Sequence, residues 1–202
     1  MSRQERQAGK NPHDAIRTFI CIEIPESVKE RVSILQGELK KIDAQVSWVK
    51  PANIHLTVKF LGPVAPSRIA AVCQVVEHAA SSCNSFEIEV ARTGCFPSPR
   101  KPKVLWVGLS DVPGELQRLQ QTIEEELAAA GFPREPKRFS PHLTIGRLRS
   151  PRGASEVGER LVAEAFGAQT FSANEVIVMR SDLNPSGSIY TPLARIQFRP
   201  PR

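Results

Sequence analysis

The sequence predicts an α+β fold in which antiparallel strands are covered by helices on their outer face. Three observations support this class. Alternating and β-branched runs indicate strands, and apolar residues at helical spacing indicate helices. Strands occur both in adjacent pairs and separated by helices, unlike the strict alternation of a parallel sheet. Finally, the sequence HLT occurs in two strand-like segments, at 55–57 and 142–144, which suggests a duplicated arrangement of two lobes.

The length of 202 residues suits one medium domain or two small lobes that share a core. We expect residues 1–16 to be a disordered tail and residues 17–202 to form a single two-lobed domain. The tail, which contains His13, is polar and lacks the apolar segment of a secretory signal. No apolar run approaches the length of a membrane span. The four cysteines form no C-x-x-C pair, so we expect buried free thiols in a reducing compartment. We expect the protein to be cytoplasmic and a monomer.

Local patterns predict the elements of the first half of the chain. Strands are predicted at 17–24, 46–50, 54–61 and 86–90, and helices at 26–41 and 67–81. Because successive strand residues point to opposite faces, His55, Thr57 and Lys59 should share one face of their strand. Phe60 should then point to the opposite face.

The second half begins with a Pro-rich loop at 93–103 and continues with four further strands. These strands are predicted at 104–109, 141–148, 174–183 and 190–198, the last two joined by a turn. Leucine and isoleucine at helical spacing from Leu116 to Leu127 predict a helix that ends at Gly131. Residues 153–165 are weakly helical.

The repeated motif can supply a pair of proton-transfer groups. Residues i and i+2 of a strand share a face, so His55 lies with Thr57 and His142 with Thr144. If the two strands lie side by side about a pseudo-twofold axis, two imidazoles and two hydroxyls line one cleft. One imidazole can accept a proton while the other donates one, and the hydroxyls can donate to phosphate oxygens. This set suits a tetrahedral anion that must gain one proton and lose another.

The charge of the chain favours an anionic partner, although an inert basic surface explains it equally well. The net charge is +6 and the pI about 9.4. From Arg134 to Arg152 there are six basic residues and a single acid, Glu135. The basic segment therefore surrounds the second HLT motif.

A structural role and a metal site are the alternatives for the two histidines. One strand histidine is more often structural than catalytic, but the second copy in a matching context favours function. A catalytic metal usually takes three protein ligands, and no acid or cysteine lies two or four positions from His55 or His142. We therefore expect neither a metal nor a cofactor, and the chain has no P-loop or dinucleotide-binding motif.

Two longer segments carry a resemblance to a known family. WVKPANIHLTVKFLG at 48–62 and FSPHLTIGRL at 139–148 resemble the signatures of the two-histidine (2H) phosphoesterase superfamily. More closely, they are similar to those of the RNA 2′,3′-cyclic phosphodiesterases, also called 2′-5′ RNA ligases. The resemblance covers about residues 17–199 and includes the opening RTFICIEIP. It implies a LigT-like, pseudo-duplicated fold with antiparallel sheets lining a central cleft and helices outside.

The resemblance also implies an activity, which is metal-independent hydrolysis of an RNA 2′,3′-cyclic phosphate to a 2′-phosphomonoester. By position, His55 would donate a proton to the leaving 3′ oxygen and His142 would activate water. Thr57 and Thr144 would hold phosphate oxygens. The implied partners are RNA with 2′,3′-cyclic phosphate ends and nucleoside 2′,3′-cyclic phosphates, and 2′-5′ ligation is a further possibility. The residues alone leave acid and base unassigned, and a non-catalytic RNA- or nucleotide-binding module is the alternative.

Arg147 is a further candidate for binding the phosphate or its nucleotide. It lies five positions after His142, so strict alternation sends it to the opposite face of the strand. A bulge at Gly146 would turn it back toward the cleft, and a surface arginine is the equal alternative. Three aromatic residues are candidates for stacking a base, although core packing is the expected role of each: Phe19, Trp48 and Phe139.

Overall fold

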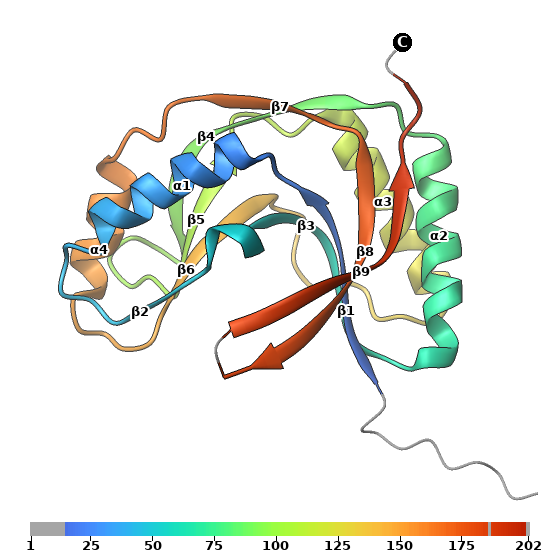
Figure 1. Ribbon diagram of the computed structural model, residues 1–202, viewed down its shortest axis with the longest axis horizontal. Coiled ribbons are helices and arrows are strands. Elements are labelled where there is room, and N and C mark those ends of the chain that lie inside the picture. Colours follow the sequence, from blue (N-terminus) through green and yellow to red (C-terminus); the bar gives the residue numbers. More distant parts are fainter. Residues whose placement is uncertain (1–14, 186, 201–202) are drawn as a thin grey trace, which may run out of the picture.

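The computed structural model describes residues 15–185 and 187–200. His13 and the rest of residues 1–14 lie outside the described residues, so the expected tail remains a prediction there. Its expected end at residue 16 was wrong, because Ile16 pairs with Val64 and begins the first strand. In the described part, all strands join one curled antiparallel sheet in the order β7-β4-β5-β6-β3-β1-β8-β9, with β2 paired to β6 (Figure 1). The strands are β1 (Ile16–Glu23), β2 (Val46–Trp48), β3 (His55–Val64), β4 (Phe86–Phe96), β5 (Val104–Leu109), β6 (His142–Leu148), β7 (Gln169–Ala173), β8 (Glu175–Asn184) and β9 (Gly187–Gln197). The predicted fold class is confirmed.

The helices cover the outer side of this sheet in two pairs (Figure 1). They are α1 (Glu26–Leu39), α2 (Ile69–Ser81), α3 (Gly114–Ala129) and α4 (Ala154–Ala163). Helices α1 and α4 pack on the half of the sheet that contains β4, and α2 and α3 pack on the half that contains β3 and β8. The apolar stripe that predicted α3 is fully buried. No helix of the described chain is long and apolar enough to cross a membrane.

The two halves of the sheet meet between β3 and β6. Their ladder consists of one residue pair, Leu56 with Leu143, and each leucine directly follows one of the histidines. Because an antiparallel pair has local twofold symmetry, His55 and His142 are placed symmetrically about this point. The halves are not consecutive in the chain, which passes between them several times: β1 and β3 belong to one half, β4 to β6 to the other, and β8 and β9 to the first again.

Both motif strands contain an extra residue at the same position. On β3, Thr57 pairs with Cys21 and Lys59 with Ile20, which leaves Val58 as a bulge. On β6, Thr144 pairs with Trp106 and Gly146 with Leu105, which leaves Ile145 as a bulge. Each bulge lies three residues after its histidine, so the duplication extends beyond the HLT letters.

The bulges correct two expectations based on strict alternation. Lys59 does not share the face of His55, because the extra residue turns its side chain inward, where it is 2% exposed. Phe60 turns outward instead and is 43% exposed. On the other motif strand, Arg147 is exposed on the cleft side, as the bulge hypothesis predicted, although the extra residue is Ile145 and not Gly146.

Three segments of the sheet differ from the predicted elements. Strand β4 continues to Phe96, into the predicted Pro-rich loop, because its residues 92–96 pair with β5. Strand β7 was not predicted, since its five residues are a short edge segment with little apolar content. Strand β9 begins at Gly187, so the β8–β9 hairpin is longer than expected and extends beyond the rest of the sheet (Figure 1).

Candidate active site

The two histidines are held in the same way by the chain that precedes them. His55 Nδ1 lies 2.9 Å from the carbonyl oxygen of Asn53, and His142 Nδ1 lies 2.7 Å from that of Ser140. A carbonyl can only accept a hydrogen bond, so each Nδ1 carries the proton and donates it. This leaves Nε2 of both rings as the nitrogen that exchanges protons with a substrate.

Aromatic side chains fix the plane of each imidazole. The ring of His55 stacks on Phe19 with centroids 4.6 Å apart, and Tyr190 meets it edge-on at 5.3 Å. The ring of His142 meets Phe96 edge-on at 5.0 Å. Phe19 is 3% exposed, which confirms the expectation of core packing, and it also supports a catalytic candidate.

The predicted site residues line a cleft composed of two adjoining cavities. We call the first the His55 arm; it has a volume of about 570 Å³ and contains His55, Thr57, Thr144 and Arg147 in its wall. The second, the His142 arm, has a volume of about 820 Å³. Thr57 and Arg147 line both cavities, and so does Phe60. The structure thus brings the five predicted residues to one cleft, with the histidines in different arms.

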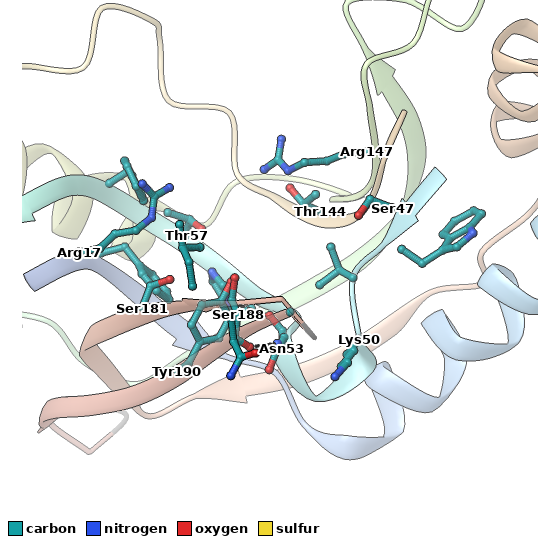
Figure 2. Close-up of a pocket in the computed structure, with 18 of the residues that line it drawn as sticks. Arg17, Ser47, Lys50, Asn53, Thr57, Thr144, Arg147, Ser181, Ser188 and Tyr190 are labelled. Atoms are coloured by element: carbon teal, nitrogen blue, oxygen red, sulfur yellow. Dashed lines mark hydrogen bonds between the residues drawn. The ribbon is translucent and has the colours of Figure 1, made fainter. Parts of the chain in front are cut away.

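In the His55 arm, groups from opposite strands face each other across the cavity. Figure 2 shows Thr144 and Arg147 of β6 on one side and Thr57 with Arg17 on the other. The guanidinium carbon of Arg17 lies 4.5 Å from the centre of the Phe60 ring. Trp48, the second aromatic candidate, also lines this arm while packing partly against the core. Phe139 is partly buried and lines the His142 arm.

The charges of the His55 arm are all positive among the described residues that line it. Its cations are Arg17, Lys50, Arg147 and Arg149, and its wall includes no aspartate or glutamate. None of the four forms an ion pair within the described ranges, although Arg149 donates to Ser47 Oγ at 3.0 Å. Unpaired cations around two hydroxyls are suited to a phosphate group.

Several of these residues were missed by sequence reasoning. Arg17 and Tyr190 come from β1 and β9, which reach the cleft only through the order of the strands. Phe60 had an available signal, because it lies five positions after His55 as Arg147 lies five positions after His142. Comparing positions beyond HLT in the two copies would have identified it.

The two imidazoles share a lowered pKa but have different charged neighbours. Burial is the largest cause and lowers the pKa of both rings from the usual 6.5, and the bond to the backbone carbonyl partly opposes it. The carboxylate of Glu23 raises the pKa of His55, whereas the guanidinium of Arg147 lowers that of His142. These neighbours favour a proton on His55 and a neutral ring at His142.

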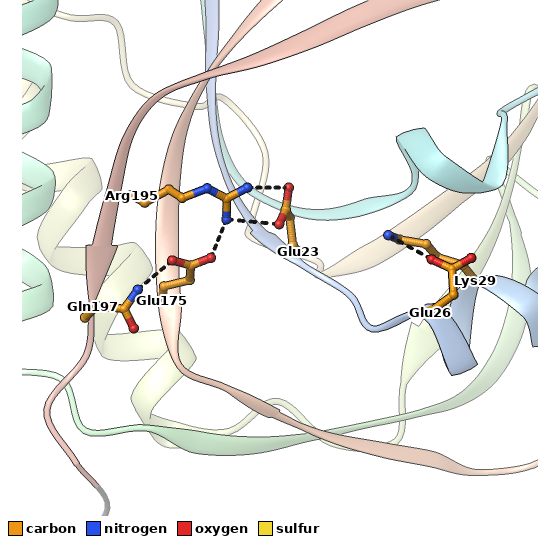
Figure 3. A network of polar contacts seen from close by, with 6 residues as sticks. All are labelled: Glu23, Glu26, Lys29, Glu175, Arg195 and Gln197. Atoms are coloured by element: carbon orange, nitrogen blue, oxygen red, sulfur yellow. Dashed lines mark hydrogen bonds and ion pairs between the residues drawn. The ribbon is translucent and has the colours of Figure 1, made fainter.

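A network on three strands holds Glu23 beside His55, its partner in the β1–β3 ladder. Arg195 of β9 donates to both carboxylate oxygens of Glu23, at 3.1 and 3.2 Å, and to Glu175 of β8 at 2.5 Å (Figure 3). Gln197 donates to the other oxygen of Glu175 at 2.6 Å. The carboxylate that acts on His55 is therefore fixed in place.

A buried glutamine secures the bulge of β6. Gln36 on α1 is 1% exposed, and its Nε2 donates to the carbonyl oxygens of Val49 and Ile145 at 2.8 and 2.9 Å. Ile145 is the extra residue, whose carbonyl also accepts from the backbone of Val49 at 3.0 Å. Gln36 thus positions the turn of the strand between Thr144 and Arg147.

No cluster of three or more His, Cys, Asp or Glu side chains within residues 15–185 and 187–200 is arranged to hold a metal ion. The absence of a metal requirement remains a prediction, for which chelation is the test.

Two symmetric histidine–threonine strands on a curled antiparallel sheet, facing a basic cleft, define the class of two-histidine phosphoesterases. A profile of the 2′-5′ RNA ligase superfamily matches residues 24–185, and the chain belongs to this family.

Named relatives agree with this membership. The chain is 35% identical over 178 residues to an RNA 2′,3′-cyclic phosphodiesterase of Methanothermobacter thermautotrophicus, covering 87% of this chain and 95% of the relative. It is 32% identical over 184 residues to a protein of the same name from Thermotoga maritima, covering 91% and 96%.

Solved structures show the same fold. One described as a phosphoesterase has a TM-score of 0.75 at 22% identity, covering 92% of this chain and 99% of that one. Escherichia coli LigT complexed with NADP+ has a TM-score of 0.74 at 21% identity, with the same coverage.

Proposed function

We propose that this protein is an RNA 2′,3′-cyclic phosphodiesterase that forms a 2′-phosphomonoester by two-histidine acid–base catalysis. The observation that carries the proposal is the symmetric pair of imidazoles, each with Nδ1 bound to a backbone carbonyl. The relatives bear the name of this activity over nearly the whole chain. The cation-lined cleft supports an RNA end as the substrate.

The cyclic phosphate binds between the two motif strands. The hydroxyls of Thr57 and Thr144 donate to its non-bridging oxygens, and Arg147 compensates its negative charge. The exposed face of Phe60, backed by Arg17, offers a stacking surface for the terminal base.

The charged neighbours of the two rings then decide which histidine accepts a proton and which donates one. His142, kept neutral by burial and by Arg147, accepts a proton from water through Nε2. His55, beside Glu23, donates its Nε2 proton to the 3′ oxygen as the P–O3′ bond breaks. The new P–O bond leaves a 2′-phosphate and a free 3′-hydroxyl, so the atoms and protons balance.

The test is incubation of EDTA-treated protein with a short RNA that ends in a 2′,3′-cyclic phosphate. We expect phosphorus NMR to show a 2′-phosphate from the wild type and almost none from His55→Ala or His142→Ala. His78→Ala is the matched control, since His78 is an exposed histidine on α2 bound to Glu126. Intact affinity without turnover in the wild type would instead support a binding module. Activity that chelation removes and a divalent ion restores would overturn the metal-independent mechanism.

A further inference from the structure

The loop between α3 and β6, residues 130–141, leads directly to His142. Its residues 135 and 137–140 line the His142 arm. The carbonyl of Ser140, near the end of this loop, accepts the hydrogen bond from His142 Nδ1. The orientation of the imidazole therefore depends on what holds the loop in place.

Two hydrogen bonds attach the loop, and both go to one buried ion pair. Lys59 Nζ donates to the carbonyl oxygen of Pro133 at 3.2 Å, and the backbone N–H of Glu135 donates to Glu124 Oε1 at 2.7 Å. Lys59 Nζ and Glu124 Oε2 bind each other at 2.6 Å. No other hydrogen bond joins residues 133–139 to the rest of the described chain.

Apolar side chains anchor both ends of this loop but not its middle. Phe132 is 7% exposed, and the guanidinium carbon of Arg68 lies 3.8 Å from the centre of its ring. At the other end, Phe139 packs partly against the core. Residues 133–138 between them are all exposed. The ion pair is therefore what fastens the middle of the loop to the body of the protein.

We propose that Lys59 and Glu124 are positioning residues for His142, which they hold through the loop and not by contact. This inference rests on the function proposed above, in which His142 is the base. Lys59 lies on β3, four residues after His55, and Glu124 lies on α3. The strand that carries one histidine thus fixes the loop that holds the other.

Burial separates Lys59 from the substrate. Its side chain lines the His142 arm but is only 1% exposed, and its Nζ is bound by Glu124 and by the carbonyl of Pro133. A buried ion pair adds little net stability compared with apolar side chains of similar volume. Polar side chains are needed here because the loop presents both a carbonyl, which must accept, and an N–H, which must donate. A positioning role accounts for both groups of the pair.

The test is an NMR titration of the ring nitrogens in ¹⁵N-labelled protein, with His142→Ala to assign the signals of His142. In the wild type the neutral ring should be a single tautomer with its proton on Nδ1. Lys59→Met/Glu124→Leu removes both attachments of the loop and keeps the buried site filled. We expect this ring to mix both tautomers and its pKa to rise toward 6.5, while the signals of His55 stay.

The direction of this shift follows from the causes of the lowered pKa of His142. Burial is the largest cause, and Arg147 also lowers the pKa, whereas the bond to Ser140 opposes them. A released loop admits water to the ring, which weakens the effect of burial and screens Arg147. The double variant removes one charge of each sign, so its direct electrostatic effect is small. The other charged side chains that line the arm are Lys59, Lys103, Glu135, Lys137 and Arg138.

A matched pair of variants in the loop separates the attachment from the charge. Glu135→Pro removes the N–H that donates to Glu124 and leaves the ion pair in place, whereas Glu135→Ala keeps this N–H. Both variants remove the same carboxylate from an exposed position. We expect Glu135→Pro to mix the tautomers of His142 and Glu135→Ala to keep the single one.

Kinetics on the cyclic phosphate gives a second measure. In Lys59→Met/Glu124→Leu, kcat should fall by about tenfold because the base is misplaced. KM should hold, since Thr57 and Thr144 keep their places on the strands. Leu161→Ala is the control for general loss of stability, because it opens a cavity at a fully buried position of α4. This variant should keep the wild-type titration of His142.

Each outcome decides the role of the pair. A single tautomer and a wild-type titration of His142 in Lys59→Met/Glu124→Leu overturn the positioning role, and so does an equal shift in Leu161→Ala. If the double variant does not fold, a result in Glu135→Pro that matches Glu135→Ala overturns it as well. The titration needs no substrate. If the wild type forms no 2′-phosphate, the proposed function is wrong, and the titration still shows whether the pair holds His142.

Discussion

The two motif strands have the same backbone and different surroundings. From His55 to Phe60 and from His142 to Arg147 the order of buried and exposed side chains is identical, and both contain the bulge at the fourth residue. The strands diverge after the bulge, where β3 has Lys59 and Phe60 and β6 has Gly146 and Arg147. The difference teaches that a repeated strand supplies the geometry, while the charged neighbours, Glu23 beside His55 and Arg147 beside His142, make the surroundings of the two histidines unequal.

The residue directly after each bulge anchors its strand to a different part of the fold. Lys59 is buried and pairs with Glu124 of α3 at 2.6 Å. Gly146 lies under β2, where a Cβ atom would come within 2.8 Å of Val46 and 3.1 Å of Trp48. One half-site therefore depends on a buried charge pair, and the other on close approach of two strands.

The largest loss of activity should come from replacing either histidine, and a substrate with a modified leaving atom should show which histidine is the acid. We expect His55→Ala and His142→Ala each to lower kcat by about 10²–10⁴. With sulfur in place of the 3′ oxygen, the leaving atom needs little protonation. On this substrate the kcat of His55→Ala, relative to wild type, should be at least about tenfold higher than on the oxygen substrate, whereas the relative kcat of His142→Ala should not change. Rapid-quench kinetics on both substrates measures this; recovery in His142→Ala alone would reverse the assigned roles.

The next largest effect should follow from breaking the anchor of β3. Glu124→Gln leaves the charge of Lys59 buried without its partner, which should reduce the free energy of unfolding by about 3–5 kcal/mol. Urea denaturation measures the change. In the control Lys59→Met/Glu124→Leu, both charges are gone and most of the stability should return. A loss below about 1 kcal/mol in Glu124→Gln would show that water reaches the lysine.

A smaller loss is expected at the bulge of β6. Gln36→Leu removes the donor from the buried carbonyls of Val49 and Ile145, which should cost about 1–3 kcal/mol of stability. Since the bulge orients Arg147, KM for the cyclic phosphate should rise as well. Gln117→Leu, an exposed position on α3, is the control. Lost stability with an unchanged KM would limit Gln36 to a structural role.

The smallest effect is a displacement of the pH profile. Both imidazoles have a lowered pKa, so the bell-shaped kcat/KM of the wild type should have its maximum below pH 6.5. Glu23→Gln removes the charge that raises the pKa of His55. Because the acid must be protonated to act, the alkaline limb should move to lower pH, by about one unit or less. The acidic limb, which belongs to His142, should stay.

The control for this displacement is Glu26→Gln. It removes an exposed carboxylate that pairs with Lys29 at 3.4 Å near the same network (Figure 3). A shift of the acidic limb instead of the alkaline one in Glu23→Gln would assign the base to His55.

Much of this arrangement was predictable because period-two and helical patterns extend over whole elements. The strands of the motif and the amphipathic helix α3 followed from such patterns. The directions of Lys59 and Phe60 did not, because a bulge adds one residue without a characteristic composition. The paired HLT segments indicated the histidines and threonines. Arg17 and Tyr190 were missed because their place in the cleft depends on long-range strand order.

The carbonyl bonds to the two Nδ1 atoms have a consequence for the catalytic cycle as a whole. In the proposed mechanism each ring exchanges protons through Nε2 alone, so one turnover would end with His55 neutral and His142 charged. That form is the one suited to closing the cyclic phosphate again, by microscopic reversibility. Under that mechanism the protein would return to its starting protonation state through buffer and solvent between turnovers. The free enzyme would then exist in two protonation states, and at high flux their interconversion would become a kinetic step of its own.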